Sequence, residues 1–207
     1  GAARRPPASR RRGDGRTVDS LSRPESRTAV RILGVDPGSR AAGWAIVSFD
    51  GAPRLTAAGV LRPATSSSFA ERLLALHDAL LTVIERERPD EAAVERVFSG
   101  VNPQSLITLG EARGVLLLAL ARSGLPVHEV TPAEIKKTVT GTGQAGKEQV
   151  RRMVLALVGA PAGSSRLAFD AADAAAAALT HGFRTSAGRR GLRSGPSSSP
   201  VRPRVAG

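Results

Sequence analysis

The chain has 207 residues, a formal net charge of +12 and no cysteine, and only 3% of its residues are aromatic. This length is sufficient for one α/β domain with a complete core. The lack of cysteine excludes a disulfide-stabilised scaffold and a thiolate metal site. No apolar run approaches the ~20 residues of a membrane span, and the N-terminus lacks the apolar segment of a secretory signal. We therefore expect a cytoplasmic protein with no membrane partner.

The positive charge is concentrated at the two ends of the chain. Residues 1–28 contain eight arginines and three acids, and residues 185–207 contain five arginines and no acid. Both segments are rich in Arg, Pro, Ser and Gly, a composition that cannot bury enough apolar surface to fold. We predict a disordered N-terminal extension over 1–28, one folded domain over 29–184, and a disordered basic tail over 185–207. The domain has 17 Lys and Arg against 15 acids, a net charge of +2, so its function must depend on particular residues.

The first half of the domain is predicted to form a β-meander, a helix and a further strand. The runs AVRILGVD (29–36), WAIVSF (44–49) and RLTAAGVLR (54–62) are separated by short turns, which is typical of three antiparallel strands. An amphipathic helix follows, with a capping box formed by Ser68 and Glu71 and a stop at Pro89. The run DEAAVE (90–95) predicts a fourth strand.

The second half alternates helices with one more strand. The helix predicted over 102–124 is apolar on nearly all sides at Gly114–Ala121, so it should be buried in the core or against another subunit. PVHEV (126–130) predicts a fifth strand. Thr131 and Glu134 form a capping-box pattern at the start of a short helix, and KEQVRRMVLALVG (147–159) predicts the next helix. A last, alanine-rich helix ends near Gly182. The prediction is an α/β fold, a five-stranded mixed sheet flanked by helices, with ligands bound beyond the carboxyl ends of its strands.

Two aspartates stand three residues apart at the start of this last helix. Asp170 and Asp173 could simply favour the positive end of the helix dipole. They also share one helix face, with Cβ atoms ~5–6 Å apart, and two carboxylates this close repel each other unless a cation lies between them. Both interpretations are open from this segment alone.

Two more acids end predicted strands, Asp36 the first and Glu95 the fourth. Asp36 precedes Pro-Gly and would fit an ordinary turn, whereas Glu95 interrupts a strand that should be buried. If the two strands are parallel neighbours, both carboxylates emerge at one sheet edge, where the last helix could add its aspartates. Oxygen ligands of this kind indicate Mg²⁺ or Mn²⁺. Two such ions ~3.5–4 Å apart can catalyse phosphodiester cleavage.

The three lysines of the chain are clustered. Of 30 basic residues, 27 are arginines, and the lysines are Lys136, Lys137 and Lys147. This clustering could arise by chance on a solvated face, or it could mark a site that needs a compact ammonium group.

Four segments resemble, in order and spacing, the RuvC-type Holliday-junction resolvases. They are ILGVDPGSRAAGWAIV (32–47), AVERVFSGVNPQSLITLGEARG (93–114), IKKTVTGTGQAGKEQV (135–150) and DAADAAAAALTH (170–181). The resemblance implies an RNase-H-like fold, a homodimer and the RuvA-RuvB branch-migration complex as a partner. It also implies an Mg²⁺-dependent endodeoxyribonuclease that nicks two opposed strands of a four-way DNA junction in recombination and repair. Both arginine-rich tails lie outside it.

The resemblance assigns roles to single residues. The four acidic ligands of the family fall on Asp36, Glu95, Asp170 and Asp173, which implies two Mg²⁺ ions per active site, with Mn²⁺ as the alternative; some relatives carry His at the position of Asp170. This favours the metal-binding interpretation of the paired aspartates over the helix-dipole one.

The remaining matches concern DNA and the histidines. Phe98 resembles the aromatic residue that stacks on an unpaired base, although a core phenylalanine is the alternative. Lys136 and Lys147 match basic residues near the cleaved phosphate, which makes Lys147 a candidate catalytic group, and Lys137 is expected to contact phosphate. Asn102 and Arg113 also match DNA-binding positions, but surface polarity of a helix would explain both. The histidines are expected to be structural or exposed: His77, His128, and His181 as a dipole partner at the end of the last helix.

Three other classes of protein compete with this interpretation. Small nucleases resembling ribosomal-RNA processing factors share the Asp-x-Gly turn, but are not expected to combine ERVF (95–98) with DAAD (170–173). A sugar-kinase-like or actin-like ATPase could use VDPGSR (35–40) to bind phosphate, but requires two such domains. A DNA-binding protein with an inactive site is disfavoured by the complete set of acids.

Overall fold

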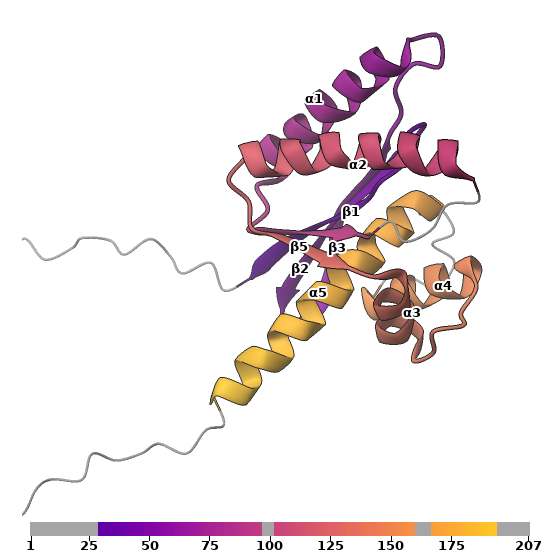
Figure 1. Cartoon of the computed structure of the whole chain (residues 1–207). Helices are drawn as coiled ribbons and strands as arrows, with labels where there is room; N and C mark the ends of the chain where they lie inside the picture. The colour runs from indigo at the N-terminus through magenta and orange to yellow at the C-terminus, as the bar shows by residue number, and fades with distance from the viewer. Residues whose placement is uncertain (1–28, 97–101, 160–166, 194–207) are drawn as a thin grey trace, which may run out of the picture.

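The sheet has the five-stranded mixed form that the sequence predicts. The computed structural model describes residues 29–96, 102–159 and 167–193 (Figure 1). The strand order is β3-β2-β1-β4-β5; the β1–β2 and β2–β3 pairs are antiparallel, and the β1–β4 and β4–β5 pairs are parallel. The strands are β1 (Val30–Asp36), β2 (Ala42–Asp50), β3 (Ala52–Leu61), β4 (Glu91–Glu95) and β5 (Val127–Val130).

Helices cover both faces of this sheet (Figure 1). One core cluster joins the sheet to α1 and α2, and a second joins its other face to α3, α4 and α5. Both predicted capping boxes are confirmed, at Ser68 with Glu71 and at Thr131 with Glu134. The helices are α1 (Phe69–Glu87), α2 (Pro103–Arg122), α3 (Pro132–Thr140), α4 (Lys147–Leu157) and α5 (Phe169–Arg193).

The strand side chains alternate between the two cores. Leu33 and Val35 of β1 pack in the core under α1 and α2, whereas Ile32 packs in the core under α5. Since successive side chains of a strand point to opposite faces, Asp36 belongs to the face that α5 covers. The same alternation holds on β4, where Ala93 packs under α5, so Glu95 shares that face.

Helix α5 lies unusually close to the sheet because both partners present small residues. Its central alanines are fully buried, and the strand below contributes Gly43, where an added Cβ would lie 1.9 Å from the carbonyl oxygen of Asp170. Gly43 pairs with Asp36 across the β1–β2 ladder. This contact therefore sets the first turn of α5 directly beside the end of β1.

One predicted boundary and one predicted absence differ from the structure. Helix α5 continues past residue 184 to Arg193, so the predicted domain boundary falls inside it. Among the described residues, α2 is long and apolar enough, by length and composition alone, to cross a membrane, which makes the expectation of no such segment wrong. Core helices pass the same test, and α2 packs Ala112, Leu116 and Leu120 into the core shared with α1.

Candidate active site

The parallel pairing of β1 with β4 brings two of the predicted acids together. Val35 pairs with Val94, and the next residues along the two strands are Asp36 and Glu95. Both carboxylates therefore emerge at the carboxyl end of the sheet on the face covered by α5. The expectation that these strands are parallel neighbours is confirmed.

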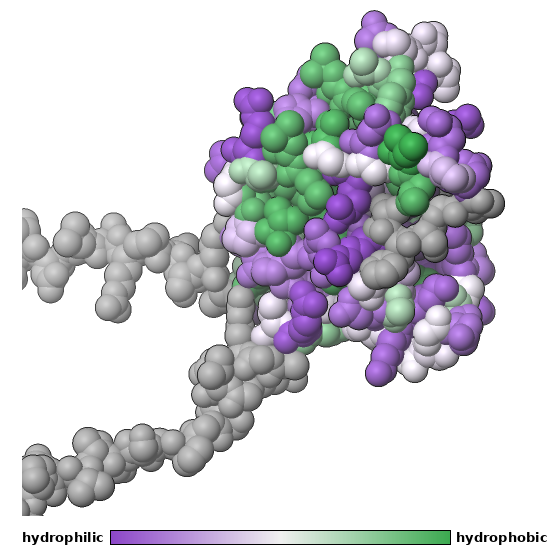
Figure 2. Space-filling model, viewed as in Figure 1, coloured by the Kyte–Doolittle hydropathy of each residue, from purple (hydrophilic) through white to green (hydrophobic). Residues whose placement is uncertain are grey.

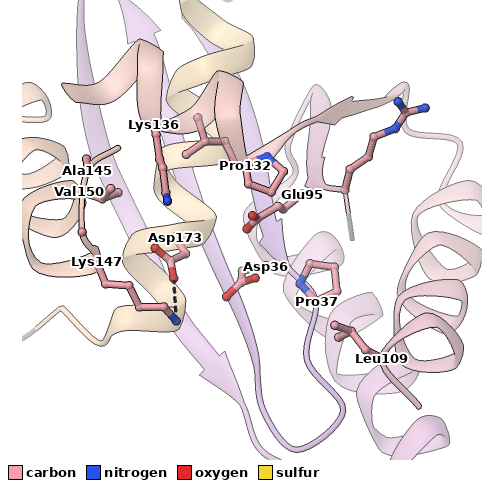
Figure 3. A pocket seen from close by; sticks show the side chains of 13 residues that line it. Asp36, Pro37, Glu95, Leu109, Pro132, Lys136, Ala145, Lys147, Val150 and Asp173 are labelled. Atoms are coloured by element: carbon pink, nitrogen blue, oxygen red, sulfur yellow. Dashed lines mark ion pairs between the residues drawn. The ribbon is translucent and has the colours of Figure 1, made fainter. Parts of the chain in front are cut away.

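Three of the four predicted acids line a cavity of about 500 Å³ at this edge of the sheet. Asp36, Glu95 and Asp173 reach it from β1, β4 and α5, and their carboxylates point toward the same space (Figure 3). Asp170 is not among the lining residues. It stands one turn earlier on α5, close enough for its charge to raise the pKa of both Asp36 and Asp173.

Burial and mutual repulsion make these carboxylates difficult to ionise. Burial, followed by the charges of Glu95, Asp173 and Asp170, raises the pKa of Asp36 to about 8. Burial and the charge of Asp173 raise the pKa of Glu95 to about 7, and burial is also the main cause of the raised pKa of Asp173. Groups held in this way ionise readily only when a cation joins them.

Two of the three lysines reach the same cavity, and the third does not. Lys147, at the start of α4, places its Nζ 4.0 Å from Oδ2 of Asp173, and Lys136 of α3 also lines the cavity (Figure 3). Both lower the pKa of Glu95, and Lys147 lowers that of Asp36 and Asp173. Lys137 is exposed and does not line the cavity. The lysine cluster thus separates into two site residues and one surface residue.

The other predicted DNA contacts have structural partners or lie outside the described residues. Asn102 caps α2, where its Oδ1 accepts a hydrogen bond from the Ser105 backbone N–H at 2.8 Å. Arg113 lies 2.9 Å from the carboxylate of Glu129 and also donates to the Glu95 carbonyl at 3.4 Å. Phe98 falls in 97–101, outside the described residues.

Sequence reasoning missed Arg96 and Glu129. Glu129 of β5 accepts a 2.6 Å hydrogen bond from Nε of Arg96 and pairs with Arg113, and these contacts lower its pKa. Arg96 also lines the cavity, directly after Glu95. Arg96 directly follows Glu95, and this position could have indicated it as a site residue. Its partner Glu129 is 33 residues away, and no local pattern indicates that pair. The pair holds the end of β4 against β5.

The prediction that His181 stands at the end of the last helix as a dipole partner is wrong. Because α5 continues to Arg193, His181 lies inside the helix rather than at its end, and it is buried. Its Nε2 lies 2.5 Å from Oε2 of Glu91, and burial is the main cause of its lowered pKa. His128 on β5 is half-exposed and stacks on the His181 ring. His77 pairs with the neighbouring Asp78.

The donors of the cavity fit a hard divalent cation. They are carboxylate oxygens from three separate elements, with no sulfur or imidazole donor among the lining residues. Magnesium and manganese prefer such oxygen ligands. A bound dication would also offset the repulsion that raises the pKa of Asp36 and Glu95.

The sheet order and the acidic cavity together define the class of the protein. A sheet in this order with helices on both faces is RNase-H-like. An acidic cavity at the carboxyl ends of its strands is the arrangement of a metal-dependent nuclease.

Comparison with known proteins then identifies the family. Residues 32–181 match the family model of the crossover junction endodeoxyribonuclease RuvC. The RuvC of Paramagnetospirillum magneticum is 50% identical over 153 residues, covering 73% of this chain and 90% of the relative, and that of Caulobacter vibrioides is 46% identical over 167 residues, covering 80% and 96%. The chain belongs to the RuvC family, whose members use a divalent metal ion.

Solved structures agree with this assignment. Thermus thermophilus RuvC superposes with a TM-score of 0.69 at 31% identity, covering 77% of this chain and 97% of the other. The same protein in complex with a Holliday junction substrate gives a TM-score of 0.68 at 33% identity, covering 77% and 96%. A yeast mitochondrial Holliday junction resolvase, at 17% identity and a TM-score of 0.54, shares the fold.

Proposed function

We propose that this crossover junction endodeoxyribonuclease resolves four-way DNA junctions by paired, symmetric nicks in strands of like polarity, using two Mg²⁺ ions per site. The observation that carries the proposal is the convergence of Asp36, Glu95 and Asp173 with Lys136 and Lys147 on one open cavity. Resolution of Holliday junctions serves recombination and repair. Because a bacterial chromosome lies in the cytoplasm, we infer that the enzyme works there.

The chemistry requires hydrolysis of one phosphodiester in each strand. Water adds to phosphorus and the bond to the 3′ oxygen breaks, which leaves a 5′-phosphate and a 3′-hydroxyl. Asp36, Glu95, Asp173 and Asp170 would hold the metal ions, which supply an acidified water and neutralise the leaving oxygen when bound. Manganese could serve in place of magnesium.

The lysines act on the phosphate itself. Lys147 approaches Asp173 from α4 and Lys136 enters from α3, so both ammonium groups face the space between the acids. Negative charge grows on the phosphate oxygens as water adds, and a fixed ammonium group stabilises that charge. Lys137, outside the cavity, would contribute to binding the DNA backbone alone. Phe98 remains a predicted base-stacking residue.

The test uses a labelled four-way junction with Mg²⁺. We expect two symmetrically placed nicks and ligatable products, and no cleavage of the matching linear duplex. Cleavage of linear duplex at an equal rate would contradict selectivity for junctions. The RuvA-RuvB complex remains a partner predicted from the resemblance.

We further propose that the enzyme is a homodimer through α2. Ile107 and Leu118 are 56% and 53% exposed and lie about three helical turns apart, on one side of the helix. Figure 2 shows hydrophobic residues gathered along α2 and the adjoining part of α1. Burying an apolar surface of this kind favours association by roughly 25 cal/mol per Å² before association costs. Two identical sites related by a two-fold axis can each reach one of two strands of like polarity on opposite sides of a junction.

The structure selects the residue with which to test this dimer. Leu116 and Leu120 are fully buried and Leu117 is half-buried, so Leu118 is the outward leucine of Gly114–Ala121. We expect Leu118→Glu to weaken the dimer in sedimentation and to replace paired nicks with single ones. Met153→Glu, an exposed position on α4, is the control and should leave the sedimentation unchanged. An unchanged dimer in Leu118→Glu would contradict this interface.

A further inference from the structure

A second polar cluster lies at the other end of the same sheet face. Glu91 begins β4, four residues before Glu95; His128 lies on β5, and His181 lies on α5, eight residues beyond Asp173. Their donor atoms all lie within 4.8 Å of one another. The side chain of His181 is 1% exposed, that of Glu91 is 19% exposed and that of His128 is 37% exposed. The cluster is therefore sheltered, with one open side.

The distances within the cluster suit a shared ion. Nε2 of His181 and Nε2 of His128 lie 2.5 Å and 3.6 Å from the same Oε2 of Glu91. In a tetrahedral zinc site, with bonds of about 2.0–2.1 Å, adjacent donor atoms lie roughly 3.3 Å apart. The two distances bracket that value. The third separation, between the two Nε2 atoms, is within 4.8 Å, so the ligand atoms can come together through side-chain movements.

We propose that Glu91, His128 and His181 form a binding site for a divalent transition-metal ion, with zinc as the expected ion. Imidazole nitrogens favour zinc and its neighbours over magnesium, so this site and the carboxylate site should select different metals. Three protein ligands leave the fourth position to water, on the side where His128 is half-exposed. The site is separate from the proposed nuclease chemistry.

Binding requires the proton on Nε2 of His181 to move, which breaks its hydrogen bond to Glu91, and the contact of Arg184 with Nδ1 to open. A guanidinium only donates, so the contact of Arg184 with Nδ1 of His181 at 3.4 Å places the ring proton on Nε2, facing Glu91. When the metal takes Nε2, that proton passes to Nδ1, and the net charge of the imidazole does not change. Arg184 is exposed and can turn into solvent. The two stacked rings, with centroids 3.9 Å apart, splay so that both nitrogens face the ion.

The ion would link α5 to two strands, β4 and β5, that already pair with each other in the sheet. Its ligands come from β4, β5 and α5, and β5 is an edge strand of only four residues. A metal that binds only the folded state stabilises that state by mass action. Zinc should therefore raise the melting temperature of the protein without taking part in cleavage.

The experiment measures zinc binding by the full chain in a background that lacks two cavity acids, Asp36→Asn with Asp173→Asn. Equilibrium dialysis against zinc chloride, followed by elemental analysis, should give about one zinc per chain. Adding His128→Phe keeps an aromatic ring against His181 and removes one ligand. We expect that change to weaken zinc binding by more than the ~10–100-fold that loss of an outer partner costs. His77→Gln is the matched control and should bind zinc as the background does.

A second probe reports on coordination directly. Cobalt(II) should give the intense visible absorption of a tetrahedral nitrogen and oxygen site in the background chain, and Glu91→Gln should reduce it. Equal zinc stoichiometry in the presence and absence of His128→Phe would overturn the site, as would failure of the background chain to bind zinc. Both readouts measure metal binding and not cleavage, so neither result depends on the proposed nuclease function.

Discussion

Two polar clusters of opposite character lie along α5, one at its start and one near its middle, on shared elements. At its start, acids surround a cavity, and the pKa values of Asp36 and Glu95 rise because burial and the neighbouring carboxylates oppose ionisation. About 12 Å along the helix, at 1.5 Å per residue, Glu91 and two histidines are packed together and satisfy one another. Strand β4 supplies a glutamate to each cluster, Glu95 to the acids and Glu91 to the histidines, on the same face of the sheet.

This difference shows how one scaffold separates stability from chemistry. Polar side chains that hydrogen-bond to one another hold elements together. Carboxylates that repel one another are stabilised only when an external cation binds between them. In the proposed function, a cation offsets the repulsion between the acids and in turn attracts a phosphate. The carboxyl end of the sheet, where the acids repel one another, is thus the end proposed to bind a charged substrate.

The largest expected effect compares the same substitution at the two ends of β4. Glu95→Gln should reduce cleavage of a four-way junction by at least ~10³-fold, because a metal-bound charge worth several kcal/mol in the transition state is lost. Junction binding measured without metal should persist or tighten. Glu91→Gln should leave the cleavage rate in Mg²⁺ near that of the wild type. Near-normal single-turnover cleavage by Glu95→Gln would reject the acids as metal ligands.

A smaller effect is expected from the lysines at the carboxylate end. Lys147→Ala should slow single-turnover cleavage by about 10²-fold, the scale for removing one fixed group that stabilises a developing charge. Lys137→Ala, outside the cavity, should change the salt dependence of binding and not the rate. If Lys147→Ala alters only that salt dependence, Lys147 is a backbone contact.

The smallest effect concerns stability without divalent ions. Asp36 has a folded-state pKa of about 8 against an ordinary 3.8, so the folded protein retains a proton that the unfolded chain has lost between these values. Its contribution is therefore fully present below about pH 4 and is lost as the pH rises through about 8. Urea unfolding in EDTA should show the free energy of unfolding falling over this range.

Two variants and one addition sharpen that measurement. Asp36→Asn should flatten the pH dependence, whereas Asp50→Asn, at an exposed strand end, should not. Magnesium should restore stability above neutral pH in the wild type, since a bound cation favours the ionised acids. A pH profile that Asp36→Asn leaves unchanged would show that the repulsion lies elsewhere.

Sequence reasoning was most successful where local chemistry decides the structure. Capping boxes at Ser68 and Thr131 depend on residues three positions apart, and Asp36 and Glu95 could be placed by the rule that parallel strands end at one edge. These patterns are short-range or topological. The sheet, its helices and the edge that carries the cavity could be predicted for this reason.

The failures concern contacts between residues distant in sequence. His181 meets Glu91 across 90 residues, and no local pattern indicates that pair. Gly182 suggested a helix end, but it is buried against Phe49, where an added Cβ would lie 2.0 Å from the ring. The helix continues past Gly182, and this position is a glycine because Phe49 leaves no room for a side chain. Arg113 likewise has a partner, Glu129, that only the folded chain brings near, whereas the partner of Asn102 is only three residues away.

The wide spacing of the acids along the chain has a consequence for biosynthesis. Asp36 and Glu95 belong to the first half of the domain, whereas Asp170 and Asp173 begin α5, its last helix. A ribosome releases the strands first, so a nascent chain can pair β1 with β4 while α5 is still in the exit tunnel. Such a chain has half of its acids and no lid over that sheet face. The proposed nuclease site is therefore complete only after α5 has been synthesised and has packed on the sheet.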